Sequence, residues 1–192
     1  MNRTFRIQST LTGLALLLML CALPARAECT REDTFTKNEI TQKAEAFFGA
    51  MTEGLATVIE KVFKEQGRPN AYIAGTEASG AIGVGLRYGE GTLFHKCAGS
   101  RKVYWQGPSV GWDVGANASK TFVLIYNLKD QDALFQRFPG VEGTFYYVAG
   151  VGVNYQRSGN ITLAPIRTGV GLRAGANIGY LHYTRKHSWL PL

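Results

Sequence analysis

The sequence contains few of the side chains on which most enzymes and metalloproteins depend. It has three histidines, His95, His182 and His187, and no closely spaced pair of cysteines accompanies them. A structural zinc site is therefore not predicted. The Gly-Lys-Ser/Thr element of a phosphate-binding loop is absent as well. We expect no catalytic residue, no metal site and no cofactor, and so a protein that is not an enzyme.

Acidic residues are also scarce. The chain has 21 lysines and arginines against 14 aspartates and glutamates. The imbalance lies in residues 71–192, which hold 12 basic and 6 acidic residues, whereas residues 28–70 hold 6 and 8. This excess favours anionic partners, but it is too small to indicate a nucleic-acid-binding protein.

The sequence has one long apolar run, and it lies near the N-terminus. Arg3 and Arg6 precede the stretch Leu11–Leu23, and the small residues Ala25 and Ala27 follow it. This is the pattern of a secretory signal peptide, and 13 residues fall short of the roughly 18–20 that a spanning helix needs. We expect residues 1–27 to be cleaved and the remaining chain to be exported to the periplasm.

Two cysteines, Cys29 and Cys97, remain after that cleavage. In an oxidising compartment a single pair predicts one disulfide, which would connect the mature N-terminus to a loop about 68 residues later. The alternative is a pair of free thiols.

A helical segment and a β-rich segment follow one another in a single domain, residues 28–70 and 71–192. Thr36-x-x-Glu39 is a capping box, and apolar residues then recur at helical spacing as far as Phe63. Gly49 and Gly54 interrupt the pattern, so we expect two amphipathic helices that pack on the sheet. An alternative is that the amphipathic segment lies on a membrane surface.

Residues 71–192 contain 19 of the 23 glycines, and short apolar runs there alternate with turn sequences. This pattern predicts a small, roughly eight-stranded antiparallel β-barrel. Glycines spaced by two, such as Gly83 and Gly85, permit sharp bending and close approach of a packed side chain. "FYYVAGVGVNY" (residues 145–155) has the alternation of one strand. In residues 166–176, Ile166, Thr168 and Val170 share one face of a predicted strand, and Arg167 and Arg173 share the other.

Two barrel types fit such alternation. In a soluble barrel the aliphatic face lines the core, whereas in an outer-membrane barrel it faces lipid and the arginines line the lumen. "TFVLIY" (residues 121–126) is apolar on both faces, which favours the soluble type.

Aromatic and basic residues form the candidate ligand site. Aromatic faces beside arginine suit sugar rings or lipid headgroups, although the same rings are also suited to filling a core. The candidate ligand-binding residues are Arg87, Tyr104, Trp105, Trp112, Arg167 and Arg173. Three acids, Glu77, Glu90 and Asp113, leave a glycan hydrolase as an alternative.

Several blocks resemble a known family. "RPNAYIAGTEASGAIGVGLRYGEGTL", "VYWQGPSVGWDVGANAS" and "LAPIRTGVGLRAGANIGYLHYT" are similar to signature blocks of the envelope integrity protein A family of alphaproteobacteria. This resemblance implies a soluble periplasmic barrel needed for envelope integrity and stress resistance, and it implies no catalytic residue. "GLRYGEGTL" also resembles part of the SYLF lipid-binding domain.

We therefore expect a non-enzymatic periplasmic protein that supports the envelope by binding a lipid, a glycolipid or an anionic glycan, with peripheral membrane contact. The alternatives are an integral outer-membrane barrel and a cell-wall glycan hydrolase.

Overall fold

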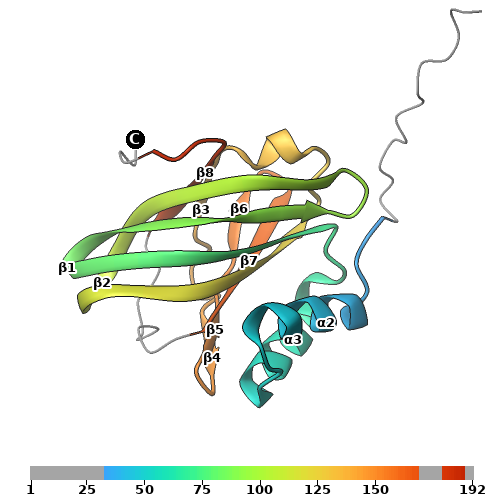
Figure 1. Ribbon diagram of the computed structural model, residues 1–192, viewed down its shortest axis with the longest axis horizontal. Coiled ribbons are helices and arrows are strands. Elements are labelled where there is room, and N and C mark those ends of the chain that lie inside the picture. The colour runs from blue at the N-terminus through green and yellow to red at the C-terminus, as the bar shows by residue number, and fades with distance from the viewer. Residues whose placement is uncertain (1–32, 169–178, 189–192) are drawn as a thin grey trace, which may run out of the picture.

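A computed structural model describes residues 33–168 and 179–188, and for residues 80–84 and 109–118 it describes the backbone alone (Figure 1). The expected signal peptide, Cys29 and Arg173 lie outside the described residues. Within them, two helices cover one side of a strongly curled antiparallel sheet (Figure 1).

The two helices form where the sequence predicts them. α2 spans Lys37–Phe48, and the Thr36–Glu39 capping box opens it. Gly49 ends it in the left-handed conformation with φ 95°, which glycine adopts without strain. α3 spans Glu53–Gln66, with Thr52 as its N-cap and Gly67 as its C-cap. The predicted break between two helices is confirmed.

A long hairpin forms most of the sheet. β1 (Ala71–His95) and β2 (Gly99–Tyr126) are antiparallel partners along their whole length, with one irregularity between Ser79 and Ala81. Both strands bend back on themselves, as Figure 1 shows. The two ends of β1 therefore meet, and Lys96, just after β1, donates its backbone N–H to the carbonyl of Asn70, just before it.

Short strands complete the sheet along the free edge of β2. β8 (Tyr180–Thr184) pairs with its first half and β7 (Ile161–Thr168) with its second half. β3 (Arg137–Pro139) pairs with the other edge of β8. In the chain it comes after the short 3-10 helix η1 (Gln131–Leu134). β5 (Val151–Val153) and β6 (Gln156–Ser158) share the other edge of β7, and β4 (Tyr146–Val148) pairs with β5. A bridge between Gly140 and Gln156 links the end of β3 to β6.

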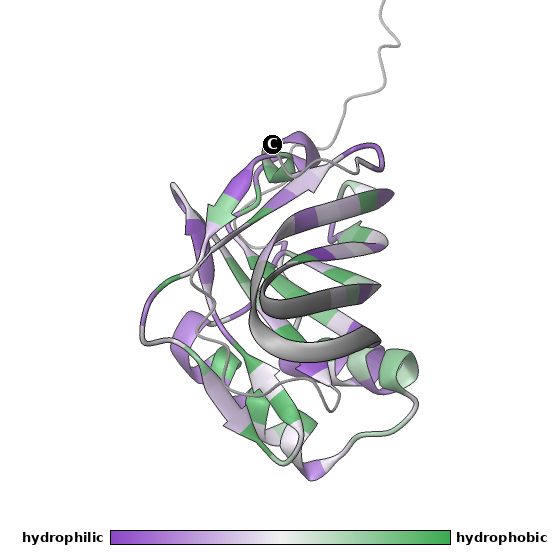
Figure 2. Cartoon of the chain, turned by 90° about the vertical axis from the view of Figure 1, so that its left-hand side faces the viewer, coloured by the Kyte–Doolittle hydropathy of each residue, from purple (hydrophilic) through white to green (hydrophobic). Residues whose placement is uncertain are grey.

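The curled sheet separates two apolar cores. Phe122, Leu124 and Tyr126 of β2 point toward the helices and pack with Leu55, Ile59 and their neighbours. Val123 and Ile125 of the same strand point into the concave side, together with Leu163 and Leu181. Both faces of this stretch are buried, which explains why "TFVLIY" carries apolar residues on both faces. Figure 2 colours the chain by hydropathy, and the strands of the curled sheet carry both hydrophobic and hydrophilic segments.

Glycines allow the curled hairpin to close on its own side chains. Gly75 and Gly91, near opposite ends of β1, lie so close that a Cβ on Gly91 would be 2.9 Å from the Cα of Gly75. A Cβ on Gly89 would lie 2.0 Å from the indole of Trp105, which packs directly on this glycine. Glycine is thus required by close approach here.

The segment "FYYVAGVGVNY" is a hairpin rather than one strand. Ala149 and Gly150 have φ angles of 45° and 82°, the two positive values of a type I′ turn between β4 and β5. The alternation of apolar residues continues across the turn, so the sequence pattern conceals it.

The predicted fold class is confirmed. The described residues form a mainly β, glycine-rich antiparallel sheet of eight strands that curls in the manner of a barrel, with two helices packed on it.

Candidate functional site

Charged side chains are buried on the concave side of the sheet, beside its apolar core. Glu77 of β1 and Arg167 of β7 are each 4% exposed, although both lie among inward-facing apolar neighbours. We call the group around them the buried charge cluster; it consists of Glu77, Arg87, Trp105, Asn154, Arg167 and Tyr183.

Arg167 and Glu77 form the centre of the buried charge cluster. Nε of Arg167 donates to Oε1 of Glu77 at 2.9 Å, and a second guanidinium nitrogen donates to Oε2 at 3.5 Å. The remaining nitrogen donates to Oδ1 of Asn154 at 2.8 Å. Asn154 follows directly after β5, whose Gly152 is the cross-strand partner of Arg167. It lies before β6 begins, and its side-chain amide reaches Arg167.

Two further donors surround the carboxylate of Glu77. Nε1 of Trp105 donates to Oε2 at 2.8 Å. Nε of Arg87 lies 3.2 Å from Oε1, and the Arg87 side chain is 16% exposed compared with 5% for that of Arg167. One carboxylate therefore faces two guanidinium groups, and Arg87 lies on the more open side.

Electrostatics keeps this carboxylate ionised. Burial by itself raises the pKa of Glu77, but the charges of Arg167 and Arg87, with hydrogen bonds from Arg167 and Trp105, outweigh it and lower that pKa below its usual 4.5. Glu77 raises the pKa of Arg87, whereas burial and the charge of Arg167 lower it, and the net change is downward. Because a guanidinium starts above 12, Arg87 stays protonated.

Tyr183 completes the buried charge cluster. It is the cross-strand partner of Trp105, and the two rings lie 5.9 Å apart. Its side chain is fully buried, and its hydroxyl has no hydrogen-bond partner among the described residues. Burial is the main reason that the pKa of Tyr183 is raised, with smaller effects from the charges of Arg167, Glu77 and Arg87. The hydroxyl therefore stays protonated and remains a donor.

Sequence reasoning named Arg87, Trp105 and Arg167, and the structure brings these three together. It places Arg167 in the interior rather than on an exposed strand face, and Trp105 among the core rings. Glu77, Asn154 and Tyr183 were missed as members of a site. The signal was present for Glu77, because an acid that follows Ile73 and Gly75 at every second position lies on an inward face.

The other candidate residues lie elsewhere or outside the described part. Tyr104 is on the opposite face of β2 from Trp105. Its ring packs edge-on against the His187 ring, with 5.8 Å between the two ring centres. The side chain of Trp112 and all of Arg173 lie outside the description. Cys97 is disulfide-bonded. Its pairing with Cys29 stays a prediction, since Cys29 is not described.

Two of the three possible hydrolase acids, Glu77 and Glu90, lie on opposite faces of β1, and the side chain of the third, Asp113, lies outside the description. Glu77 points inward, whereas Glu90 is exposed on the opposite face of β1 and pairs with Lys102 at 3.3 Å. Ser109 stands in Gly107-Pro-Ser-Val-Gly111, which has the Gly-x-Ser-x-Gly pattern of a hydrolase nucleophile. That pattern functions at a strand-to-helix turn, whereas these residues lie inside β2 and pair with β1. In the described parts of the chain no three metal-binding side chains gather.

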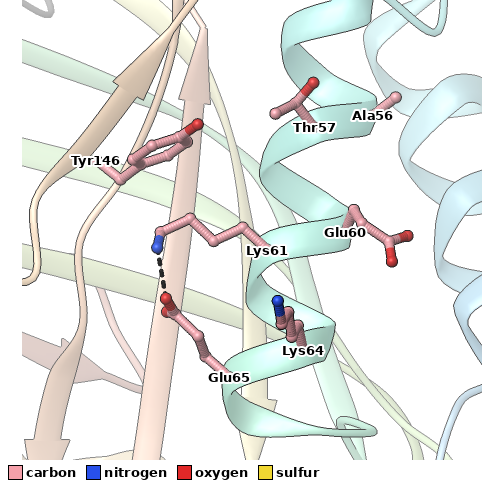
Figure 3. A pocket seen from close by; sticks show the side chains of 7 residues that line it. All are labelled: Ala56, Thr57, Glu60, Lys61, Lys64, Glu65 and Tyr146. Carbon is pink, nitrogen blue, oxygen red and sulfur yellow. Dashed lines mark hydrogen bonds and ion pairs between the residues drawn. The ribbon is translucent and has the colours of Figure 1, made fainter.

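A shallow surface depression of about 810 Å³ lies between α3 and β4 (Figure 3). Lys61 and Glu65 point toward one another across it and form an ion pair, and Nζ of Lys61 lies 4.8 Å from the centre of the Tyr146 ring. Glu65 also accepts a hydrogen bond from the hydroxyl of Tyr155. These contacts join helix to sheet, so the depression is better explained by packing than by ligand binding.

The comparisons agree with this architecture. The family model described as "Envelope integrity protein A" matches residues 33–192. A β-barrel-like, uncharacterized protein from Brucella abortus, known from a crystal structure, is 48% identical with a TM-score of 0.76. That match covers 83% of this chain and 99% of the Brucella chain. No curated protein matches the sequence. The chain belongs to the envelope integrity protein A family.

Proposed function

We propose that this protein is an exported, non-enzymatic periplasmic protein that supports the cell envelope by binding an anionic envelope component, a lipid, glycolipid or glycan. The coarser part of this statement follows from membership of its family, which implies a role in envelope integrity. The observation that carries the finer part is the buried charge cluster. Two arginines share one carboxylate on the concave side of the sheet.

Buried charged groups are unusual in a purely structural core. Cations are costly to bury unless they are paired, and a stable core of this size does not require them. An anionic ligand would be a further partner for the guanidinium groups on the concave side. The basic composition of residues 71–192 supports the same class of ligand.

The packing of the sheet supports a location in the periplasm rather than within the outer membrane. The face of β2 and β7 that lipid would contact in a membrane barrel carries Phe122, Leu124 and Ile166, and α2 and α3 cover it. In the described part of the chain none of the helices is both long and apolar enough to span a bilayer.

Cell fractionation tests the proposed location. We expect the protein to appear in the periplasmic fraction without its first 27 residues and to leave the membranes on carbonate extraction. Recovery in a carbonate-resistant pellet would overturn the proposal in favour of an integral barrel.

Ligand binding and envelope support are tested on protein from its own cells. Native mass spectrometry of protein released gently from the periplasm should show an additional anionic mass. A strain lacking the gene should become sensitive to detergents, and the wild-type gene should restore resistance. Protein that carries no additional mass and whose loss leaves the envelope intact would refute the function.

A further inference from the structure

We propose that Arg101 and Arg185 form a surface site for a phosphomonoester group, with Asp132 and Phe135 holding the two guanidinium groups in place. The site lies on the side of the sheet away from α2 and α3 (Figure 1) and is separate from the buried charge cluster. This inference rests on the proposed function in expecting an anionic envelope ligand. It goes further in naming the chemical group and the place where that group binds.

Three segments of the chain meet at this site. Arg101 belongs to β2 and is two residues before Val103, which points into the concave core. Arg185 directly follows β8, and Phe135 directly follows η1 and packs against the same core. Asp132 of η1 pairs with both arginines and so connects the segments.

Positive charge is concentrated in these three segments. Residues 99–104, 129–137 and 184–188 contain six lysines and arginines and two aspartates. Residues 33–70, which include both helices, contain five basic and six acidic residues. One further acid is nearby, because Glu90 of β1 pairs with Lys102. The basic end is therefore the part of the described chain that complements an anionic partner.

The two guanidinium groups are held in fixed positions. Nη1 of Arg101 lies 2.5 Å from Oδ1 of Asp132, and Nη2 of Arg185 lies 3.0 Å from the same oxygen. Their central carbons lie 5.2 Å and 4.6 Å from the centre of the Phe135 ring. An ion pair and a ring contact thus orient each group before any ligand binds, which lowers the entropic cost of binding.

The remaining donors indicate which anion fits. Among the described residues nothing accepts a hydrogen bond from Nε and Nη2 of Arg101, or from Nη1 of Arg185. Both side chains are open to solvent, with 39% and 55% of their surface exposed. The Nε–Nη2 edge of Arg101 suits two oxygens of one anion, and Arg185 can donate to a third. A phosphomonoester has three such oxygens, whereas a carboxylate has two.

The charges match the same group. Hydrogen bonds from Arg185 and then from Arg101 lower the pKa of Asp132 below its ordinary 3.8, so this carboxylate is ionised at neutral pH. Asp132 and the two arginines together carry one positive charge. Lys186 is exposed, comes directly after Arg185 and supplies a second. A phosphomonoester carries about −1.5 to −2 at pH 7 and balances this sum.

The test compares three double variants of the exported protein. Arg101→Gln with Arg185→Gln removes both guanidinium groups. Lys43→Gln with Lys64→Gln is the matched control, because it removes the same charge from exposed positions of α2 and α3. Arg101→Lys with Arg185→Lys keeps the charge and loses the planar arrangement of donors. None should change the melting temperature much, since exposed ion pairs contribute little to stability.

Binding is measured by sedimentation with phosphatidylcholine vesicles that contain phosphatidic acid, a monoester, or the same fraction of phosphatidylglycerol, a diester. Wild-type protein should prefer phosphatidic acid, and the lysine-to-glutamine control should bind it equally well. The arginine-to-glutamine variant should bind at least about tenfold more weakly, because each cation near an anionic surface contributes roughly a factor of five. The arginine-to-lysine variant should lose the preference for the monoester.

Calorimetry with soluble dihexanoyl phosphatidic acid and with inorganic phosphate distinguishes the sources of the group. Binding of the lipid alone assigns a headgroup, and equal binding of both assigns any terminal phosphate. Three results would overturn the inference: equal binding of the two anionic vesicles by the wild type, wild-type binding by the arginine-to-glutamine variant, or an unchanged monoester preference in the arginine-to-lysine variant.

Failure of this inference and failure of the proposed function give different results. If no probe binds the wild type but protein from the periplasm carries an anionic mass, the inference fails and the proposed function stands. If the mass persists in the arginine-to-glutamine variant, the ligand lies at another site. Absence of both the mass and probe binding would refute the two together.

Discussion

The roles of individual residues in this protein depend on the side chains that face them across the curled sheet. Glu77 lies on a strand of small and apolar residues, yet it is the anion that holds two arginines and an indole on the concave side. Trp105 fills the space that two glycines, Gly75 and Gly89, leave open. Substitutions at these positions separate electrostatic from steric contributions.

We predict that Glu77→Gln lowers the free energy of unfolding by about 3–5 kcal/mol, because it leaves Arg167 buried without its counter-ion. Urea unfolding at neutral pH measures this loss. Glu90→Gln is the matched control, since Glu90 is an exposed acid on the same strand with a single lysine partner, and it should cost less than about 1 kcal/mol. Equal effects of the two substitutions would contradict the buried ion pair.

The same carboxylate predicts the acid sensitivity of the fold. The pKa of Glu77 is lower in the folded protein than its ordinary 4.5. Its stabilisation is therefore fully present above that value and is lost as the pH falls below 4.5 through the folded-state pKa. Wild-type stability should fall steeply in this range, and that of Glu77→Gln should fall less. Parallel pH–stability curves would show that other groups control acid unfolding.

We expect Gly89→Ala to cost about 1–3 kcal/mol, because the new methyl group would lie 2.0 Å from the indole of Trp105, which its bond to Glu77 holds in place. A double-mutant cycle with Trp105→Leu checks the cause. The smaller side chain should relieve the clash, so the two costs should not add. Additive costs would point to backbone strain instead.

At the scale of elements, contacts between helix and hairpin decide how the layers join. The Lys96 ammonium, just after β1, pairs with Glu39 in the first turn of α2 and lies over the Phe35 ring at 4.6 Å. The pKa of Glu39 is lowered to about 2. The hydrogen bond from Lys96 is the largest cause, and the hydrogen bonds from Thr36 are the next largest. The capping box and the contact between layers therefore use the same carboxylate.

This shared carboxylate gives a direct spectroscopic prediction. Lys96→Met should raise the pKa of Glu39 from about 2 toward its ordinary 4.5, while the Thr36 contacts keep it somewhat below that value. A carbon-detected NMR titration of the glutamate carboxyls measures the shift. An unchanged pKa would show that Lys96 does not hold α2 against the hairpin in solution.

The turn between β4 and β5 carries avoidable strain. Ala149 is exposed and has φ 45°, a conformation that disfavours alanine and suits asparagine. Ala149→Asn creates the Asn-Gly pair that type I′ turns prefer, and it should raise the free energy of unfolding by about 0.5–1 kcal/mol. Thermal unfolding tests this, and a loss of stability would argue against the type I′ turn.

At the scale of the whole molecule, the fold has two cores on either side of one sheet, and Lys96, just after β1, joins the hairpin to the first turn of α2. Cys97 lies in the turn after β1 and is disulfide-bonded. A Cys29–Cys97 bond would fix the segment before α2 to the same end of the sheet that Lys96 contacts.

We predict that non-reducing peptide mapping of the periplasmic protein shows a Cys29–Cys97 cross-link. Closing a loop of about 68 residues should contribute on the order of 4 kcal/mol in the chain-entropy model. Cys29→Ser with Cys97→Ser should lower the stability accordingly. Two freely alkylated thiols in the native protein would exclude the bond.

The local sequence by itself determined the elements that depend on neighbouring residues. Thr36 with Glu39 and Gly49 determined both ends of α2, because caps satisfy backbone groups within one turn. Alternation and glycine content determined the class of sheet. The hairpin at Ala149 escaped prediction because the period-two pattern continues across a two-residue turn.

Tertiary structure alone decided which faces are interior. Alternation places Ile166 and Arg167 on opposite faces, but it cannot say that helices cover the first and that the sheet curls over the second. The pairing of Glu77 with Arg167 spans 90 residues and exists because β1 and β7 flank opposite edges of β2. A charged side chain can be buried only where an oppositely charged partner lies next to it. Whether the partner lies there depends on the curl of the sheet, which is set by residues far apart in the chain.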